Sequence, residues 1–245
     1  MLNIIHETKD IIIVNKPAGQ LSQGAKGFDL DLVSEVMTYN ASQGKPAYAA
    51  IINRLDRPVS GLLLIAKNKS AAAKYSTLMQ KEGGFNKQYE ALICGKLSEP
   101  KGTFVDYLKK DGRNNTSVVV PSDAAANDKE AKLSKLEYEV ISYDEVKDIT
   151  HVRIHLITGR HHQIRVQFAS RGHALVGDYK YAAYEHNAAC DMDAAGNGND
   201  SGRYDMDAAV KASSLKRNQI ALCAVSLTID DKTYTVTPDF AQNLV

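Results

Sequence analysis

The chain carries the stretch Asn53-Arg54-Leu55-Asp56-Arg57-Pro58-Val59-Ser60-Gly61, followed directly by the apolar run Leu62-Leu63-Leu64-Ile65. Pro58 fixes its own φ and favours an extended conformation for the residue before it, and Gly61 permits close approach of backbone or ligand. Because Asp56 stands between two arginines, its carboxylate is expected to stay ionised. The stretch therefore predicts a stiff, charged turn that leads into a buried strand. By itself, the pattern is more typical of an ordinary salt-bridged turn than of a functional site.

The same stretch resembles the catalytic motif of the RluA-type pseudouridine synthases, which usually reads His-Arg-Leu-Asp-x-x-Thr/Ser-Gly-Leu. Other blocks of that family follow in the same order, and in this chain they are Ile11 to Gly19, Lys87 to Ala91, Thr158 to Gln167, Gly177 to Tyr181, and Ile220 to Leu222. Each block alone is a weak signal, but their ordered combination is specific. The resemblance covers about 1–181 and 218–240.

The resemblance implies a fold and a reaction. The implied fold is α+β, with a curved, mostly antiparallel or mixed sheet flanked by helices, as in pseudouridine synthases. One catalytic domain is expected over 1–245, standing alone because the family's blocks begin almost at Met1. The implied reaction turns uridine in RNA into pseudouridine, and it needs no cofactor and no metal. The expected partner is structured RNA with a flipped-out uridine, since flipping costs least in loops and bulges.

Three catalytic residues are implied by the resemblance, namely Asp56, Tyr89 and Arg165. Asp56 can capture the sugar or base covalently, or remove a proton from the sugar, and the sequence leaves both routes open. The Tyr89 ring can stack on the target base and its hydroxyl can serve in deprotonating C5; without the resemblance, a core tyrosine is the ordinary interpretation. Arg165 is expected to pair with Asp56 and hold its carboxylate charged and oriented.

Further side chains are implied as RNA contacts, and they are Arg54, Arg57, Arg160, His162 and Lys87. Between Lys45 and Lys101 the sequence has ten basic and four acidic residues, an excess of six positive charges. Such a zone attracts phosphates and gives salt-sensitive binding. A solvated surface without a partner is the alternative for a charge excess alone.

Composition limits the class of protein. With 245 residues, 44% hydrophobic and 24% charged, the chain is expected to be soluble and globular. No apolar stretch reaches membrane-spanning length, and the first residues do not resemble a signal peptide. The three scattered cysteines suit a reducing cytoplasm. In the absence of heptads, a monomer is expected.

Two departures and one histidine group need separate mention. Asn53 replaces the family's usual histidine, and Cys223 stands where the closing block often has histidine; both can change substrate preference or rate. The histidines His151, His155, His161 and His162 suggest a metal site, but no cysteine or acidic cluster completes one nearby. No metal site is therefore expected.

Periodicity predicts the elements. Helices are expected from an Asp29 cap to about Asn40, with Leu30, Val33, Val36 and Met37 on one face, from a Ser70 cap to about Glu82, and over Gln163–Arg171. Strands are expected over Leu2–His6, Ile11–Asn15, Gln88–Gly95, Phe104–Leu108, Val118–Val120, Leu136–Ser142, Val152–Ile157, Ile220–Ile229 and Thr233–Val236. Because turns link most of these strands, the sheet should be largely antiparallel.

An acidic stretch over 183–217 breaks the pattern and predicts a loop insertion. Its acidity disfavours phosphate binding; a lid or partner contact and an insertion without a role are both open. Two other functions are also open for the whole chain. One is a non-catalytic RNA-binding or RNA-chaperone relative, and the other is an aspartate-dependent nucleoside hydrolase.

Overall fold

The computed structural model describes residues 2–24, 30–81, 84–182, 205–213, 215–216 and 218–240. The chain packs into two compact units. The first comprises Met1–Glu90 and Lys216–Gln242, and the second comprises Ala91–Leu215 and Asn243–Val245. That the two units act as one catalytic domain stays a prediction.

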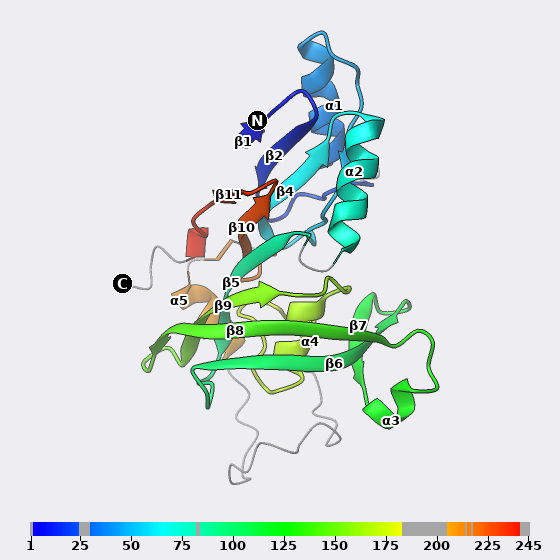
Figure 1. Ribbon diagram of the computed structural model, residues 1–245. Coiled ribbons are helices and arrows are strands. Elements are labelled where there is room, and N and C mark those ends of the chain that lie inside the picture. Colours follow the sequence, from blue (N-terminus) through cyan, green and yellow to red (C-terminus); the bar gives the residue numbers. More distant parts are fainter. Residues whose placement is uncertain are drawn as a thin grey trace. The chain divides into compact units, whose positions relative to one another are not determined.

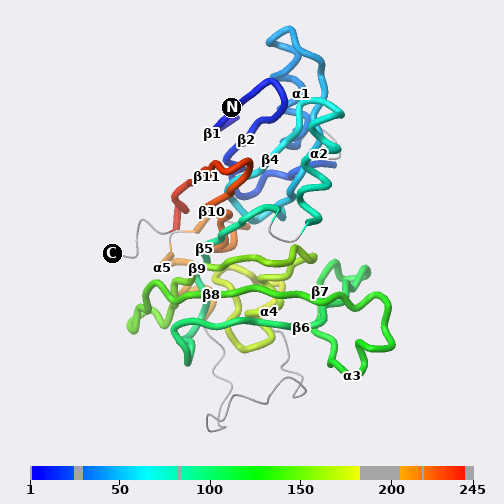
Figure 2. Tube along the Cα trace, in the orientation of Figure 1, coloured from blue at the N-terminus to red at the C-terminus, as the bar shows by residue number. Residues whose placement is uncertain are grey.

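The first unit contains a mixed sheet (Figure 1). Four strands lie side by side in the order β1 (Ile4–Glu7), β2 (Ile11–Lys16), β4 (Ser60–Ala66) and β10 (Leu222–Ile229). Two shorter strands extend them, since β3 (Ala50–Ile51) pairs with β4 and β11 (Lys232–Thr235) pairs with β10. Every pair is antiparallel except β4 with β10, which is parallel. Segments far apart in the sequence therefore meet in this unit (Figure 2).

Two helices flank this sheet, and both caps differ from the predicted ones. Helix α1 (Leu32–Ser42) begins at the N-cap Asp31, not Asp29, and α2 (Lys69–Gln80) begins at Asn68, not Ser70. In each case the side-chain oxygen accepts the backbone N–H three residues on, which satisfies one of the unpaired donors of the first turn.

The buried face of α1 also differs from the prediction. Leu32, Val36 and Asn40 are buried, whereas Leu30 and Met37 are 63% and 37% exposed. The i, i+4, i+8 spacing that starts at Leu32 is the one that faces the sheet. On α2, the side chains of Ala71, Tyr75, Leu78 and Met79 pack into a core built from β2, β4 and β10.

The second unit contains an antiparallel sheet and short helices. Its strands lie in the order β9 (Ile149–Leu156), β8 (Lys132–Asp144), β6 (Lys101–Asp111) and β7 (Thr116–Val120). Strand β5 (Asn86–Cys94) belongs to both units, because they divide after Glu90. The helices are α3 (Ser122–Ala125), α4 (Gln163–Ala169) and α5 (Met206–Ala212).

The predicted fold class, α+β with a mostly antiparallel sheet, is thus confirmed, and so are the predicted strands within a few residues. Sequence periodicity missed β3, α3 and α5. Helix α5 lies within the predicted insertion, whose residues 183–204 are outside the described residues. No helix among the described residues is long and apolar enough to cross a membrane.

Candidate functional site

Asp56 lies in a loop of the first unit, between β3 and β4. The loop closes on itself through the backbone N–H of Val59, which donates to the Asp56 carbonyl at 3.1 Å. Arg57 fastens it to the turn after β2: its Nε donates to the Gly19 carbonyl at 2.9 Å, and the Gly19 N–H donates to the Arg57 carbonyl at 2.7 Å. Gly19 has a φ of 91°, which glycine adopts without strain. The Asp56 loop is therefore held by one hydrogen bond within itself and by two hydrogen bonds to the turn after β2.

Lys16, the last residue of β2, is buried beneath this loop. Its side chain has no exposed surface, and its ammonium donates to the carbonyls of Pro17 and Gln20 at 2.9 Å each and of Arg57 at 3.4 Å. Burial lowers the pKa of Lys16 to about 8, against the opposing effect of the Asp56 carboxylate. A cation thus lies in the electrostatic environment of Asp56, and sequence reasoning had not named it among the site residues.

Tyr89 reaches the same environment from β5. Its side chain is buried, and burial together with the charges of Asp56 and Cys223 raises the pKa of its hydroxyl well above the usual 10. The hydroxyl is therefore protonated at neutral pH. Its electrostatic coupling to Asp56 places the two predicted catalytic residues of the first unit in one neighbourhood.

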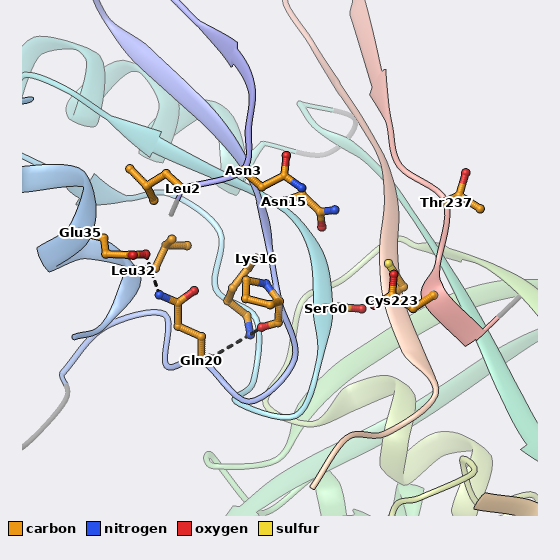
Figure 3. A pocket seen from close by; sticks show the side chains of 12 residues that line it. Leu2, Asn3, Asn15, Lys16, Gln20, Leu32, Glu35, Ser60, Cys223 and Thr237 are labelled. Carbon is orange, nitrogen blue, oxygen red and sulfur yellow. Dashed lines mark hydrogen bonds between the residues drawn. The ribbon is translucent and has the colours of Figure 1, made fainter. Parts of the chain in front are cut away.

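A pocket of about 370 Å³ opens on the first unit (Figure 3). Lys16 and Gln20 lie on one side of it, and Ser60 and Cys223 lie next to each other on strands β4 and β10. The other lining residues include Asn3, Asn15, Glu35, Thr237 and Asp239. Burial raises the pKa of the Cys223 thiol to about 11, so it is protonated at neutral pH.

Arg165 lies on α4 of the second unit, where Asp178 holds it. Its Nε and Nη2 donate to the two Asp178 oxygens at 2.6 and 2.8 Å, and both side chains are almost fully buried. The guanidinium also lies 5.1 Å from the Tyr181 ring centroid. This bidentate geometry fixes the plane of the guanidinium. The predicted pairing of Arg165 with Asp56 stays a prediction.

His162 caps α4 in a left-handed conformation, with a φ of 51°. Its ring is buried, stacks on His161 at 3.8 Å, and lies with Nδ1 2.9 Å from the Tyr181 hydroxyl. That hydroxyl accepts the Ser117 N–H at 2.7 Å. These contacts hold His162 at the start of α4; its predicted contact with RNA stays a prediction.

Arg160 is positioned by the start of α4. Gln163 Oε1 accepts the Arg160 N–H at 3.0 Å and the Thr158 hydroxyl at 2.8 Å, while its Nε2 donates to the Lys135 carbonyl. The exposed Arg160 side chain donates through Nε to the Leu133 carbonyl at 3.1 Å. The short block from Thr158 to Gln163 is therefore a rigid turn that presents one arginine.

The remaining predicted RNA contacts lie in the first unit. Arg54 and Arg57 are exposed, as phosphate contacts require. Lys87 is partly buried, with Nζ 3.6 Å from the Met79 sulfur, and burial lowers its pKa. Of the three, Lys87 is the least accessible.

The histidines form no metal centre in the part of the chain that the structure describes, where no three His, Cys, Asp or Glu side chains gather. His155 instead lies 3.3 Å from Glu137, its partner across β8 and β9.

Sequence reasoning missed three residues of the site. Lys16 and Asp178 stand inside blocks that the family resemblance had marked, so position in a block was the signal available for them. Ser22, which hydrogen-bonds the backbone of Leu55, carries no such signal, because 33 residues separate the two.

Known proteins resemble this chain in sequence and in fold. A family model described as RNA pseudouridylate synthase matches residues 10–170. An uncharacterized RNA pseudouridine synthase of Aquifex aeolicus is 31% identical over 184 residues, which are 74% of this chain and 56% of that protein. Ribosomal large subunit pseudouridine synthase D of Buchnera aphidicola is 32% identical over 185 residues, 75% and 56% of the two chains. The chain thus spans about half the length of these curated relatives.

Among solved structures, Human RNA Pseudouridylate Synthase Domain Containing 4 superposes with a TM-score of 0.71. The match covers 99% of this chain and 91% of that one, at 19% identity. Human RNA Pseudouridylate Synthase Domain Containing 1 gives 0.66, covering 98% and 84% at 22% identity. At these identities the likeness concerns the fold alone.

Proposed function

Because this chain belongs to the RNA pseudouridylate synthase family, we propose that it converts uridine in RNA to pseudouridine, with Asp56 as the essential carboxylate. The bond between ribose C1′ and uracil N1 breaks, the base turns, and C1′ bonds to C5. C5 then loses its proton, and N1 gains one. No atom is added or lost overall, so the reaction consumes no cofactor.

The observation that carries this proposal is the placement of Asp56. An irregular loop would ordinarily be mobile, yet this one is fastened to the turn after β2 and lies over a buried ammonium. A carboxylate carried on a loop that is fixed in this way is preorganised either to attack or to remove a proton. The proposal leaves both routes open.

Tyr89 is the second catalytic residue of the proposal. Its ring supplies a face for stacking on uracil. Because its hydroxyl stays protonated in the free protein, the side chain also supplies an O–H donor. Deprotonation of C5 by Tyr89 would require a phenolate, which this burial disfavours.

Arg165 is the third catalytic residue of the proposal, and its bidentate bond to Asp178 supports a fixed orientation. RNA phosphates are assigned to Arg54, Arg57 and Arg160, whose side chains are exposed. His162 and Lys87 complete the assignment as supporting contacts.

Ribosomal RNA is the substrate class that we assign first, since several relatives are named ribosomal large subunit pseudouridine synthases. Within it, the target uridine should lie in a loop or bulge, where a base leaves its stack at a cost of a few kcal/mol. Transfer RNA is the competing class.

The proposal is tested by tritium release from RNA that carries uridine labelled at C5. Ribosomal and transfer RNA are assayed in parallel with the wild-type chain, Asp56→Asn and Asp56→Ala. We expect release from ribosomal RNA by the wild type, and a loss of at least about 10³-fold in both variants, with RNA affinity retained.

Asp144→Asn is the matched control, because Asp144 is a carboxylate at the end of β8 that pairs with Lys147. It should turn over like the wild type. If the wild-type chain binds both RNAs but releases no tritium, the non-catalytic RNA-binding alternative replaces this proposal.

A further inference from the structure

We propose that Ser22 and Asn53 are positioning residues that hold the segment carrying Asp56, so that turnover depends on both although neither touches the substrate. This inference rests on the proposed function and extends it to two residues outside the predicted catalytic set. Both lie in the first unit with Asp56.

Asn53 continues the β3–β4 ladder with its side chain. The ladder pairs Ile51 with Ile65, and the Ile52 N–H donates to the Leu64 carbonyl at 2.9 Å. At Asn53 the backbone leaves the sheet, and the Asn53 side chain makes the hydrogen bonds to β4 in its place. Its Oδ1 accepts the Leu64 N–H at 2.7 Å, and its Nδ2 donates to the Leu62 carbonyl at 3.2 Å.

A carboxamide suits this position because it places an N–H donor and a carbonyl acceptor side by side, much as the backbone of a strand does. Asn53 is 9% exposed, so neither bond is readily replaced by water. The loop therefore departs from β4 at a fixed point, three residues before Asp56.

Ser22 holds Leu55, which lies two residues after Asn53. Its hydroxyl donates to the Leu55 carbonyl at 2.7 Å and accepts the Leu55 N–H at 3.3 Å. Leu55 directly precedes Asp56. It is buried and belongs to no strand or helix, so its backbone N–H and carbonyl need partners other than a regular ladder. One hydroxyl thus satisfies both backbone groups of the residue next to the carboxylate.

Ser22 is itself fixed to the N-terminus of α1. The first N–H groups of that helix lack intrahelical partners. The Leu32 N–H donates to the Leu21 carbonyl at 3.0 Å, and the Val33 N–H donates to the Ser22 carbonyl at 3.3 Å. Ser22 therefore links the backbone of Leu55 to the start of α1, while Asn53 links the same loop to β4.

Together, Ser22 and Asn53 form a two-point clamp on the four residues from Asn53 to Asp56. A misplacement of about 1 Å at a reacting group can cost about 100-fold in rate. The clamp should therefore affect kcat and leave the affinity for RNA nearly unchanged, because neither side chain is exposed to a phosphate.

The experiment measures kcat and KM by tritium release for the wild type, Ser22→Ala, Ser22→Thr, Asn53→Ala and Asn53→Asp. We expect kcat to fall about 10- to 100-fold in both alanine variants, with KM within about twofold of the wild type. Ser22→Thr keeps the hydroxyl and should recover most of kcat. Asn53→Asp keeps the acceptor but, when ionised, has no proton for the Leu62 carbonyl, so it should behave like Asn53→Ala.

Asn40→Ala is the matched control. Asn40 is fully buried in the same unit, and its side chain donates to the Tyr48 carbonyl at 2.9 Å rather than to the Asp56 loop. It should lose stability to a similar degree and keep kcat when assayed below its melting transition.

Three outcomes overturn the inference alone: kcat unchanged in both alanine variants, a loss confined to KM, or an equal loss of kcat in Asn40→Ala. A wild-type chain that releases no tritium from any RNA overturns the proposed function, and this inference with it.

Discussion

At the scale of single residues, Lys16 shows how a buried charge is accommodated. An ammonium without exposed surface is costly unless acceptors surround it, and here three backbone carbonyls do so. They do not compensate fully, because burial still lowers the pKa of Lys16 from 10.5 to about 8. The unfolded chain therefore binds more protons than the folded one between these two pH values.

Stability should consequently rise with pH in this window. We expect the free energy of unfolding of the wild type to increase between pH 8 and 10.5, by up to about 3 kcal/mol relative to Lys16→Met, in which the group is absent. Urea unfolding at several pH values measures this, followed by circular dichroism because the chain has no tryptophan. A stability difference between the two proteins that stays constant across the window would contradict it.

At the scale of elements, the parallel pairing of β4 with β10 depends on Gly61. Its φ is 116°, a conformation that other residues rarely adopt. A Cβ at this position would lie 2.4 Å from the backbone oxygen of Ala224 on β10 and 2.5 Å from its nitrogen. The sequence predicted close approach of backbone or ligand at Gly61, and the structure identifies the neighbour as backbone.

Gly61→Ala should therefore separate β10 from β4 and destabilise the first unit by at least about 3 kcal/mol. Gly112→Ala is the control, because a Cβ there meets open space and should change stability by less than about 1 kcal/mol. Urea unfolding of both variants decides the matter, and equal midpoints for the two would show that β10 can move away without cost.

At the scale of the whole molecule, a formal net charge of +1 gives no general attraction to RNA. The RNA binding that we propose must then come from local groups, and the exposed arginines of the two motif blocks are the candidates. Arg54 precedes Asp56 by two residues in the sequence, and Arg160 stands on the rigid turn before α4. The local distribution of positive charge, more than the total charge, should therefore determine how strongly this chain attracts a polyanion.

Arg54→Ala and Arg160→Ala should each weaken RNA binding and reduce the slope of log K against log salt concentration by about 0.7 to 0.9. Titrations at several salt concentrations measure this. Lys232→Ala, which removes an exposed lysine of β11, should leave the slope unchanged. An equal effect of all three variants would mean that the arginines act only as general charge.

The sequence by itself predicted most of the strands, the helices α1, α2 and α4, the family and the candidate catalytic residues, because periodicity and motif blocks are local properties of the chain. Cap positions were less predictable, since Asp29 and Asp31 are chemically equivalent and only helix packing chooses between them. Tertiary structure alone decided the bond from Lys16 to the Arg57 carbonyl, the bidentate bond from Arg165 to Asp178 and the bond from Ser22 to Leu55. These pairs are 41, 13 and 33 residues apart in sequence, and no local pattern encodes which polar groups will be buried together and must satisfy one another.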